Sequence, residues 1–369
     1  MAEPMTASAF DIRGRLRAAS STLDSSIRDF ELSASTLSEP SCLSLAARPN
    51  VSPYCLDHRN RRMVLAEGPE HVDLSSAPLC YARQYETATR LLTLSYDAVQ
   101  RVAADPAGSF ANLVLIYSIA RSGSTLLSRI WHRLDDAYSL SEPDVFTDLS
   151  HLHARAEISP GDAAQLFADA LRLLYRRAEG RKYFVVKFRA TCIQLAELGH
   201  RVAPSANLLF IYRDAVDCIA SNLRVFGELP LSSTAFRAAL PFAVPRSEVV
   251  KVPIRLRKLL LHWLSGIRRY RSLRERGLPI GAVKYETLIE APRESVTQMF
   301  RYCGVPLQFV DRGCEALRED AQQGTRLARD TTMGVQPLSA SEASSIRHFL
   351  TEHAQLSPDV TLEGTLNVG

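Results

Sequence analysis

The residues best suited to chemistry lie in the segment IYSIARSGSTLLSRIW, from Ile116 to Trp131. An apolar run ends there, a polar turn follows and an amphipathic pattern begins, which predicts a strand, a loop and a helix. The unpaired N–H groups and partial positive charge of a helix N-terminus favour anions. The loop adds one fixed charge, a glycine and three hydroxyl groups: Arg121, Gly123, Ser122, Ser124 and Thr125. We predict an anion site, with a serine-rich helix cap as the alternative.

This loop differs from the nucleotide-binding motif G-x-x-x-x-G-K-[ST]. The lysine of that motif is absent, and Ser118 stands in the position of its first glycine. The pattern therefore does not indicate binding of ATP with magnesium.

A second set of polar residues follows a later apolar run, in LLFIYRDAVDCIASNLR. Arg213 stands at the end of the predicted strand and Ser221 in the helix that follows. Open α/β sheets bind ligands outside the carboxyl ends of their strands, so Arg213 is expected at the same edge as Arg121. We predict a second anion contact here, with a capping ion pair between Arg213 and Asp214 as the alternative.

The elements that would position these residues alternate between strand-like and helix-like segments. Apolar runs predict strands at 112–119, 183–188, 206–213 and 281–286. Helical periodicity and helix-start signals predict helices at 124–134, 163–178, 192–202, 214–226 and 252–275. This alternation predicts an α/β fold with a parallel sheet and helices on both of its faces.

The first 108 residues lack this alternation. We expect residues 1–108 to form a partly flexible N-terminal accessory region before a domain at 109–369. Two apolar runs around a polar turn predict a hairpin at 54–67. The spacing of apolar residues in 85–103 predicts one helix, and Pro106 and Gly108 then mark the boundary.

The composition excludes several classes of protein. The 44 basic residues nearly balance the 40 acidic ones, so the net charge of +4 does not indicate a nucleic-acid partner. No apolar run approaches the ~20 residues of a membrane helix, and the charged N-terminus does not resemble a signal peptide. Seven widely spaced cysteines indicate neither a disulfide framework nor a zinc site. We expect a cytoplasmic protein with no metal and no membrane partner.

Three motifs, in this order, resemble the sulfotransferases, which transfer a sulfuryl group from 3′-phosphoadenosine 5′-phosphosulfate (PAPS) to a hydroxyl or amine and release PAP. RSGSTLL at 121–127 resembles the 5′-phosphosulfate loop in its arginine form, as in tyrosylprotein and bacterial carbohydrate or small-molecule sulfotransferases. RDAVDCIAS at 213–221 resembles the 3′-phosphate site. VKYETLIEAPR at 283–293, followed by CGVP, resembles a unit that borders the nucleotide. The resemblance covers 112–306 and implies a P-loop-type α/β domain.

The resemblance also implies roles for single residues. Glu142 would take the proton of the acceptor, and Lys187 and Arg121 would stabilise charge on the sulfuryl group and the departing phosphate. Asp144 and Asp148 are the nearest rival bases. The residues expected to contact the phosphates of PAPS are Arg121, Ser122, Gly123, Ser124, Thr125, Leu126, Arg213 and Ser221.

Further contacts are expected outside these motifs. Tyr285 and Arg224 would contact the nucleotide, and Gln323, Gly324 and Thr325 would form a C-terminal lid. The acceptor would be a small molecule, a carbohydrate or a peptide, and the resemblance is compatible with a homodimer. Two other functions stay open: a small-molecule kinase on the same fold, and a nucleotide-binding module without turnover.

Overall fold

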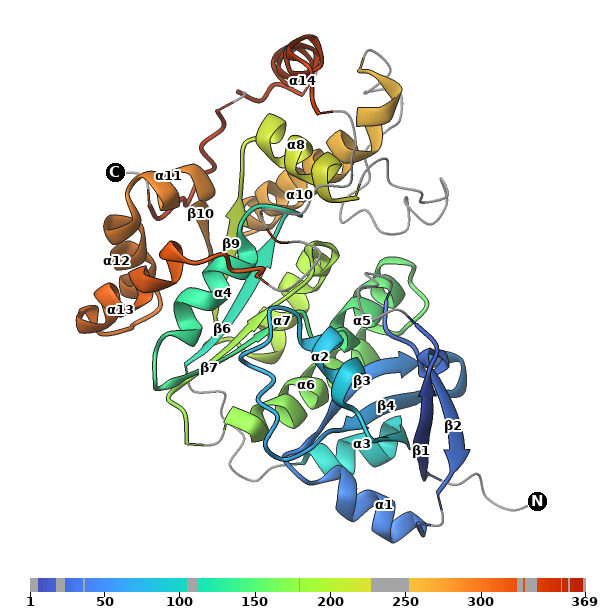
Figure 1. Cartoon of the computed structure of the whole chain (residues 1–369). Coiled ribbons are helices and arrows are strands. Elements are labelled where there is room, and N and C mark those ends of the chain that lie inside the picture. The colour runs from blue at the N-terminus through green and yellow to red at the C-terminus, as the bar shows by residue number, and fades with distance from the viewer. Residues whose placement is uncertain are drawn as a thin grey trace.

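Two β-sheets organise the chain, an antiparallel sheet in the N-terminal part and a parallel sheet after residue 112 (Figure 1). The computed structural model describes residues 6–17, 24–35, 37–104, 112–178, 180–226, 252–323, 328, 337–352, 354–357 and 359–367. The following description is confined to those residues.

The parallel sheet has the strand order β10-β9-β6-β8-β7. The strands span Leu113–Ser118 (β6), Ala137–Ser141 (β7), Tyr183–Lys187 (β8), Asn207–Tyr212 (β9) and Ile280–Lys284 (β10). Nearly all of their residues are buried, as expected for a sheet covered on both faces. The chain builds the sheet on one side of β6 and then on the other. The strand order therefore reverses beside β6, where open α/β sheets bind their ligands.

Helices cover both faces of this sheet. They span Ser124–His132 (α4), Val145–Ala154 (α5), Pro160–Tyr175 (α6), Ala196–Val202 (α7), Ala215–Phe226 (α8), Ile254–Glu275 (α10), Tyr285–Glu290 (α11), Pro292–Tyr302 (α12), Val310–Glu315 (α13) and Ala340–Glu352 (α14). Short 3-10 turns lie at Arg176–Ala178 (η3), Ala190–Leu195 (η4), Leu307–Phe309 (η6) and Ala316–Arg318 (η7). Val114 and Ile116 of β6 belong to a hydrophobic cluster with α4, α12 and α13. Leu115 and Tyr117 face the other cluster, which includes residues of α5, α6, α7 and α10.

The predicted α/β fold is confirmed, and the four predicted strands correspond to β6, β8, β9 and β10. The sequence did not predict β7, because serines interrupt the apolar run in AYSLS. The structure compensates for one of them, since the buried Ser139 hydroxyl lies 2.8 Å from the Ser128 hydroxyl of α4. This short edge strand matters because Glu142 follows it directly.

The N-terminal sheet is antiparallel and has the order β2-β1-β5-β4-β3. Its strands span Ala7–Arg15 (β1), Phe30–Ala34 (β2), Val51–Asp57 (β3), Arg62–Glu67 (β4) and Arg90–Ser95 (β5). Three helices accompany it, at Glu39–Ala46 (α1), Cys80–Thr87 (α2) and Tyr96–Ala103 (α3), with 3-10 turns at Ile27–Asp29 (η1) and His58–Asn60 (η2). We refer to this part of the chain as the N-terminal domain.

The predicted hairpin at 54–67 is confirmed by the antiparallel pairing of β3 with β4. The single helix predicted over 85–103 is wrong, because strand β5 separates α2 from α3. β5 pairs with β1 on one side and β4 on the other, and both of its faces are covered, with Leu91 in one cluster and Leu92 in another. This burial overrides the helical spacing. The Ser95 side chain then accepts the N–H of Ala98 and starts α3.

The N-terminal domain packs directly on the parallel-sheet domain. Strand β3 lies against α5 and α6, and α3 lies against α6 (Figure 1). Val51 and Leu92 of the N-terminal domain share one hydrophobic cluster with Phe146 and Phe167 of α5 and α6. The predicted boundary at Pro106 and Gly108 lies outside the described residues.

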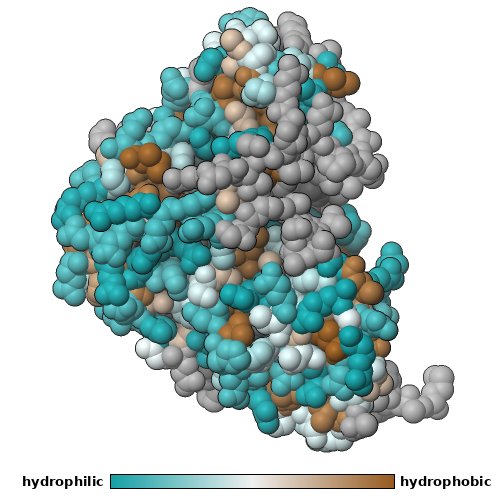
Figure 2. Space-filling model, viewed as in Figure 1, coloured by the Kyte–Doolittle hydropathy of each residue, from teal (hydrophilic) through white to brown (hydrophobic). Residues whose placement is uncertain are grey.

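The described surface in Figure 2 is largely hydrophilic, with hydrophobic residues in small separate patches. The large hydrophobic side chains that are exposed lie far apart in the sequence: Leu16, Ile254, Ile289 and Leu307. Within the described ranges, none of the helices combines the length and the apolar character needed to cross a membrane.

Candidate functional site

Five of the predicted site residues lie at the carboxyl ends of the five parallel strands. Glu142 and Arg213 directly follow β7 and β9, and Lys187 is the last residue of β8. Arg121 lies in the loop after β6, and Tyr285 directly follows β10. Because parallel strands end at one edge, the topology brings residues that are far apart in the sequence to one crevice.

The loop between β6 and α4 has an unusual backbone. Arg121 and Gly123 have φ angles of +62° and +87°, in the left-handed region that is costly for a residue with a side chain. The buried Ser122 hydroxyl donates to the Ile119 carbonyl oxygen at 2.8 Å and lies 3.1 Å from that of Ile211 in β9. The Ser122 side chain therefore fastens the loop to the sheet, and only its backbone N–H is left for a ligand.

The other loop residues differ in what they offer a ligand. Leu126 is buried in the hydrophobic cluster of α4, so its side chain serves packing. Ser124 is half-buried and is the first residue of α4. The Thr125 hydroxyl lies 3.5 Å from Lys187 Nζ, which links the loop to the end of β8.

Gly123 permits close contact between the loop and Tyr285. A Cβ atom on Gly123 would lie 2.4 Å from Cδ2 and 2.6 Å from Cε2 of the Tyr285 ring. The same ring stacks on Arg213, whose guanidinium carbon lies 4.5 Å from the ring centroid. Tyr285 therefore joins the loop after β6 to the residue after β9.

We expect Gly123→Ala to destabilise the protein more than Gly180→Ala. Gly180 also has a positive φ, +80°, but nothing lies within 4 Å of a Cβ built there. Both substitutions carry the backbone cost of about 1–2 kcal/mol, and Gly123→Ala adds a steric cost of about 1–3 kcal/mol. Urea denaturation measures both. Equal losses in free energy of unfolding would contradict the close contact with Tyr285.

Lys187 and Glu142 form an ion pair between the ends of β8 and β7. Lys187 Nζ contacts Glu142 Oε1, and the Glu142 N–H donates to the Lys187 carbonyl oxygen at 2.6 Å. The two strands are in register at this point, since Ser141 pairs with Lys187. Lys187 is 1% exposed, and Glu142 has a φ of +59°. Such backbone strain in a non-glycine residue is concentrated at functional sites.

Positive charge surrounds the Glu142 carboxylate. Burial alone would raise the pKa of Glu142, but Lys187, then Arg189 and finally Arg121 oppose it, so the pKa lies below its ordinary value. Glu142 is therefore ionised at neutral pH and can accept a proton.

Three arginines crowd the other end of the crevice. Arg121 Nε donates to the Ser221 hydroxyl at 3.2 Å. Burial makes the largest contribution to the lowered pKa of Arg121, repulsion by Arg224 comes next, and Arg213 adds to it. Guanidinium groups stay protonated at neutral pH, so the lowered pKa expresses the cost of burying the Arg121 charge near two like charges. A bound anion would relieve that cost.

Arg213 has two carboxylates nearby, and neither forms a close contact with it. Its distances to Asp217 and Glu286 are 3.7 Å and 3.8 Å. Arg213 Nε is buried and, within the described part of the chain, has no hydrogen-bond partner. A buried donor without an acceptor is costly, which fits a site that an anionic ligand completes.

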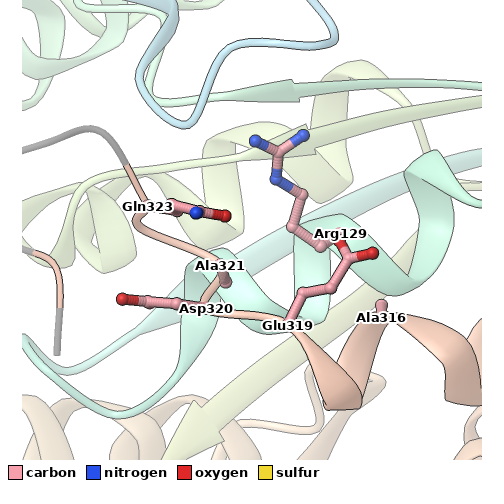
Figure 3. Close-up of a pocket in the computed structure, with 6 residues that line it drawn as sticks. All are labelled: Arg129, Ala316, Glu319, Asp320, Ala321 and Gln323. Atoms are coloured by element: carbon pink, nitrogen blue, oxygen red, sulfur yellow. The ribbon is translucent and has the colours of Figure 1, made fainter.

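The predicted lid residues fall into two groups. Gly324 and Thr325 lie outside the described residues. Gln323 lines a cavity of about 340 Å³ next to α4 (Figure 3). Arg129 projects into the same region from α4, beside the segment that carries Glu319. Among the described residues that line this cavity, Gln323 alone is a predicted site residue.

Two residues near the site were missed by sequence reasoning. Gln322, beside the predicted lid, donates from Nε2 to the Thr125 hydroxyl at 3.0 Å, and no sequence signal separates it from Gln323. Arg189 Nε lies 3.7 Å from Glu142 Oε2. Its position just beyond the end of β8 could have identified it, because side chains at that edge face the crevice.

The rival bases Asp144 and Asp148 and the histidine His151 lie beside this site. Asp144 and Asp148 are turned toward the N-terminal domain, where they accept the N–H groups of Ser25 and Leu56 at 2.7 Å and 2.8 Å. His151 Nδ1 lies 3.3 Å from an Asp24 oxygen. Across the described residues, no three His, Cys, Asp or Glu side chains are grouped to hold a metal ion.

Comparison with solved structures finds proteins of low identity. The chain is similar to sulfotransferase STF9 from Mycobacterium avium, at 13% identity over 70% of this chain and 79% of that one, with a TM-score of 0.44. It is also similar to the sulfotransferase domain of the Synechococcus PCC 7002 olefin synthase, at 18% identity over 71% and 93%, with a TM-score of 0.36. A sulfotransferase from Alicyclobacillus acidocaldarius is 17% identical over 65% and 94%, with a TM-score of 0.36.

Comparison with protein families gives a more direct result. A search of curated proteins finds no match to the chain. The model of the sulfotransferase family matches residues 114–309, which is more than half of the chain and includes β7, β8, β9, β10 and all but the first residue of β6. The chain therefore belongs to the sulfotransferase family.

Proposed function

We propose that this sulfotransferase uses PAPS as the donor and transfers the sulfuryl group to a hydroxyl or amine, releasing PAP. The observation that carries the proposal is the set of three arginines beside the loop after β6: Arg121, which donates to Ser221, and Arg213 and Arg224, whose charges repel that of Arg121. PAPS carries phosphate groups at both its 3′ and 5′ positions, so it would place negative charge at two points of this group. Charge-assisted hydrogen bonds from arginine to such groups are among the stronger polar contacts in proteins.

The residues that would hold the donor come from three elements. Arg121, the hydroxyls of Ser124 and Thr125, and the N–H groups at the start of α4 would hold the 5′-phosphosulfate. Arg213 and the Ser221 hydroxyl would hold the 3′-phosphate, and Tyr285 keeps Arg213 in place by stacking. When bound, PAPS supplies the sulfuryl group, and PAP is the product that remains after the transfer.

Glu142 would accept the proton of the acceptor as the acceptor oxygen or nitrogen attacks sulfur. Its lowered pKa keeps it ionised at neutral pH, which is the form that can take a proton. Lys187 and Arg121 would stabilise the negative charge that moves toward the departing phosphate. Positioning and charge stabilisation dominate phosphoryl transfer, and the same reasoning applies to the related transfer of a sulfuryl group.

The proposal predicts that PAP stabilises the protein without a metal ion. At 100 times its dissociation constant a ligand adds about 2.7 kcal/mol, or roughly 3 °C in Tm for a chain of this length. A thermal-shift panel of PAP, ADP and ATP, each with and without Mg²⁺, measures this.

Arg213→Gln should weaken PAP binding by about 10–150-fold, because one charged hydrogen bond contributes about 1.5–3 kcal/mol.

Arg312→Gln is the matched control for Arg213→Gln. Arg312 lies on α13 and pairs with Asp135 on the exposed surface at 2.8 Å, so its substitution should leave the PAP response unchanged. Stabilisation by ATP with Mg²⁺ alone would favour the kinase interpretation. PAP binding without turnover on any hydroxyl or amine tested would favour an inactive nucleotide-binding module.

A further inference from the structure

Arg189 lies near both carboxylates of the loop after β7, Glu142 and Asp144. Its Nε lies 2.9 Å from Asp144 Oδ1 and 3.7 Å from Glu142 Oε2, and its side chain is 15% exposed. Lys187 contacts the other oxygen of Glu142, Oε1. A cation therefore lies beside each oxygen of the Glu142 carboxylate, with Lys187 in contact with one oxygen and Arg189 3.7 Å from the other.

The N-terminal domain fixes the position of Arg189. The Tyr81 ring, at the start of α2, lies against the guanidinium group, with the guanidinium carbon 4.2 Å from the ring centroid. Asp24 Oδ1 lies 3.4 Å from Arg189 Nη1. The Ser25 N–H donates to Asp144 Oδ2 at 2.7 Å, so the same segment holds the carboxylate that pairs with Arg189.

Tyr81 also reaches the element that carries Ser221. With Leu79 and Ala82, it forms a small hydrophobic cluster with Val225 of α8. The start of α2 thus lies between the loop that carries Glu142 and the helix that carries the proposed 3′-phosphate contact. A shift of the N-terminal domain would therefore move Arg189 relative to Glu142.

We propose that Arg189 is a positioning residue for Glu142, and that the N-terminal domain sets the orientation and charge of this proposed base through Tyr81, Asp24 and Ser25. The inference rests on the proposed function of Glu142. A carboxylate with a cation beside each of its oxygens is restrained in orientation, which is what a base needs to meet the acceptor proton.

The charged groups around this contact come from every neighbouring element. They are Lys187 from β8, Arg121 from the loop after β6, Asp144 from the loop after β7, Asp148 and His151 from α5, and Asp24 from the N-terminal domain. Burial would lower the pKa of Arg189, but Asp144, Tyr81, Glu142 and Asp24 together raise it. Arg189 thus stays charged, and the loss of its charge would raise the pKa of Glu142.

The test is a titration of Glu142 by carbon-13 NMR of protein labelled at the glutamate carboxyl carbon. The Glu142 signal is identified by its loss in Glu142→Gln. We expect Arg189→Gln to raise the pKa of Glu142 by about one pH unit. Tyr81→Leu should raise it by a smaller amount, because Arg189 keeps its charge but loses one contact that fixes it.

Arg177→Gln is the matched control. Arg177 also joins the two domains, since its Nη1 donates to the Val72 carbonyl oxygen at 3.0 Å, but it has no part in the Glu142 contacts. It should leave the pKa of Glu142 unchanged. If Arg189→Gln does not fold, the double variant Arg189→Gln with Asp144→Asn removes both buried charges together and allows the same titration.

An unchanged Glu142 pKa in folded Arg189 variants would overturn the proposal, and so would an equal change in Arg177→Gln. An unchanged Glu142 pKa in folded Tyr81→Leu would overturn the part assigned to the N-terminal domain.

The titration needs neither donor nor acceptor, so its outcome is independent of the PAP panel. A normal PAP response with an unchanged Glu142 pKa would reject the role of Arg189 alone. An absent PAP response with a raised Glu142 pKa would reject the PAPS proposal alone.

Discussion

Replacing Glu142 with glutamine is expected to lower kcat by about 10²–10⁴-fold, the usual contribution of a general base. Glutamine keeps the size of the side chain but cannot take a proton. The PAP-induced rise in Tm should persist, because Glu142 is not among the groups proposed to hold the phosphates. Radiolabelled PAPS and an acceptor found by screening phenols, alcohols and amines provide the assay.

Asp148→Asn is the matched control, since Asp148 is a rival base whose carboxylate faces the Leu56 N–H of the N-terminal domain. Its kcat should stay close to that of the unmodified protein. A large loss in Asp148→Asn with little loss in Glu142→Gln would reverse the assignment. The pH profile gives a second measurement: the pKa of Glu142 is lowered, so the acid limb of kcat/KM should lie below the ordinary glutamate pKa of about 4.3.

Lys187→Met is expected to lower kcat by about 10²–10³-fold, as when a single preorganised donor is removed from the charge that develops in a transition state. Methionine retains most of the apolar stem in this buried position and removes only the charged group. Because Arg189 stays beside Glu142, the carboxylate keeps one cation. The measurement compares kcat and the PAP-induced shift in Tm at pH 8, which favours the ionised form of Glu142 in both proteins.

Lys182→Met provides the comparison for Lys187→Met. Lys182 precedes the same strand at its opposite end, where its Nζ lies 5.6 Å from the Tyr183 ring centroid. It should leave kcat unchanged. Equal losses in the two variants would show that the effect comes from the stability of β8 and not from charge in the crevice.

The sequence predicted the site residues that directly follow a long apolar run. Arg121 and Arg213 follow long apolar runs, and such runs become central strands whose carboxyl ends must meet. Strand β7 was missed because its two serines are buried despite their polarity, Ser139 with the Ser128 hydroxyl as its partner. A single sequence does not reveal which polar residues will find such partners.

The N-terminal domain was the least predictable part of the chain. Leu91 and Leu92 have neighbours at helical spacing, yet β5 lies between two strands that are distant in the sequence. Arg189 was missed as a site residue for the same reason, because its contacts with Tyr81 and Asp24 depend on how the two domains pack. Contacts of this kind leave no periodic pattern in the residues that make them.

The hydrophobic cluster shared by the two domains has a consequence for the cooperativity of unfolding. Val51 and Leu92 pack into the same interior as Phe146 and Phe167, so the two domains cannot separate without exposing an apolar face on each. We therefore expect heat to melt the chain in one calorimetric transition, despite its two sheets. A shortened chain that starts after residue 104 would leave the outer faces of α5 and α6 uncovered, and such surfaces promote aggregation.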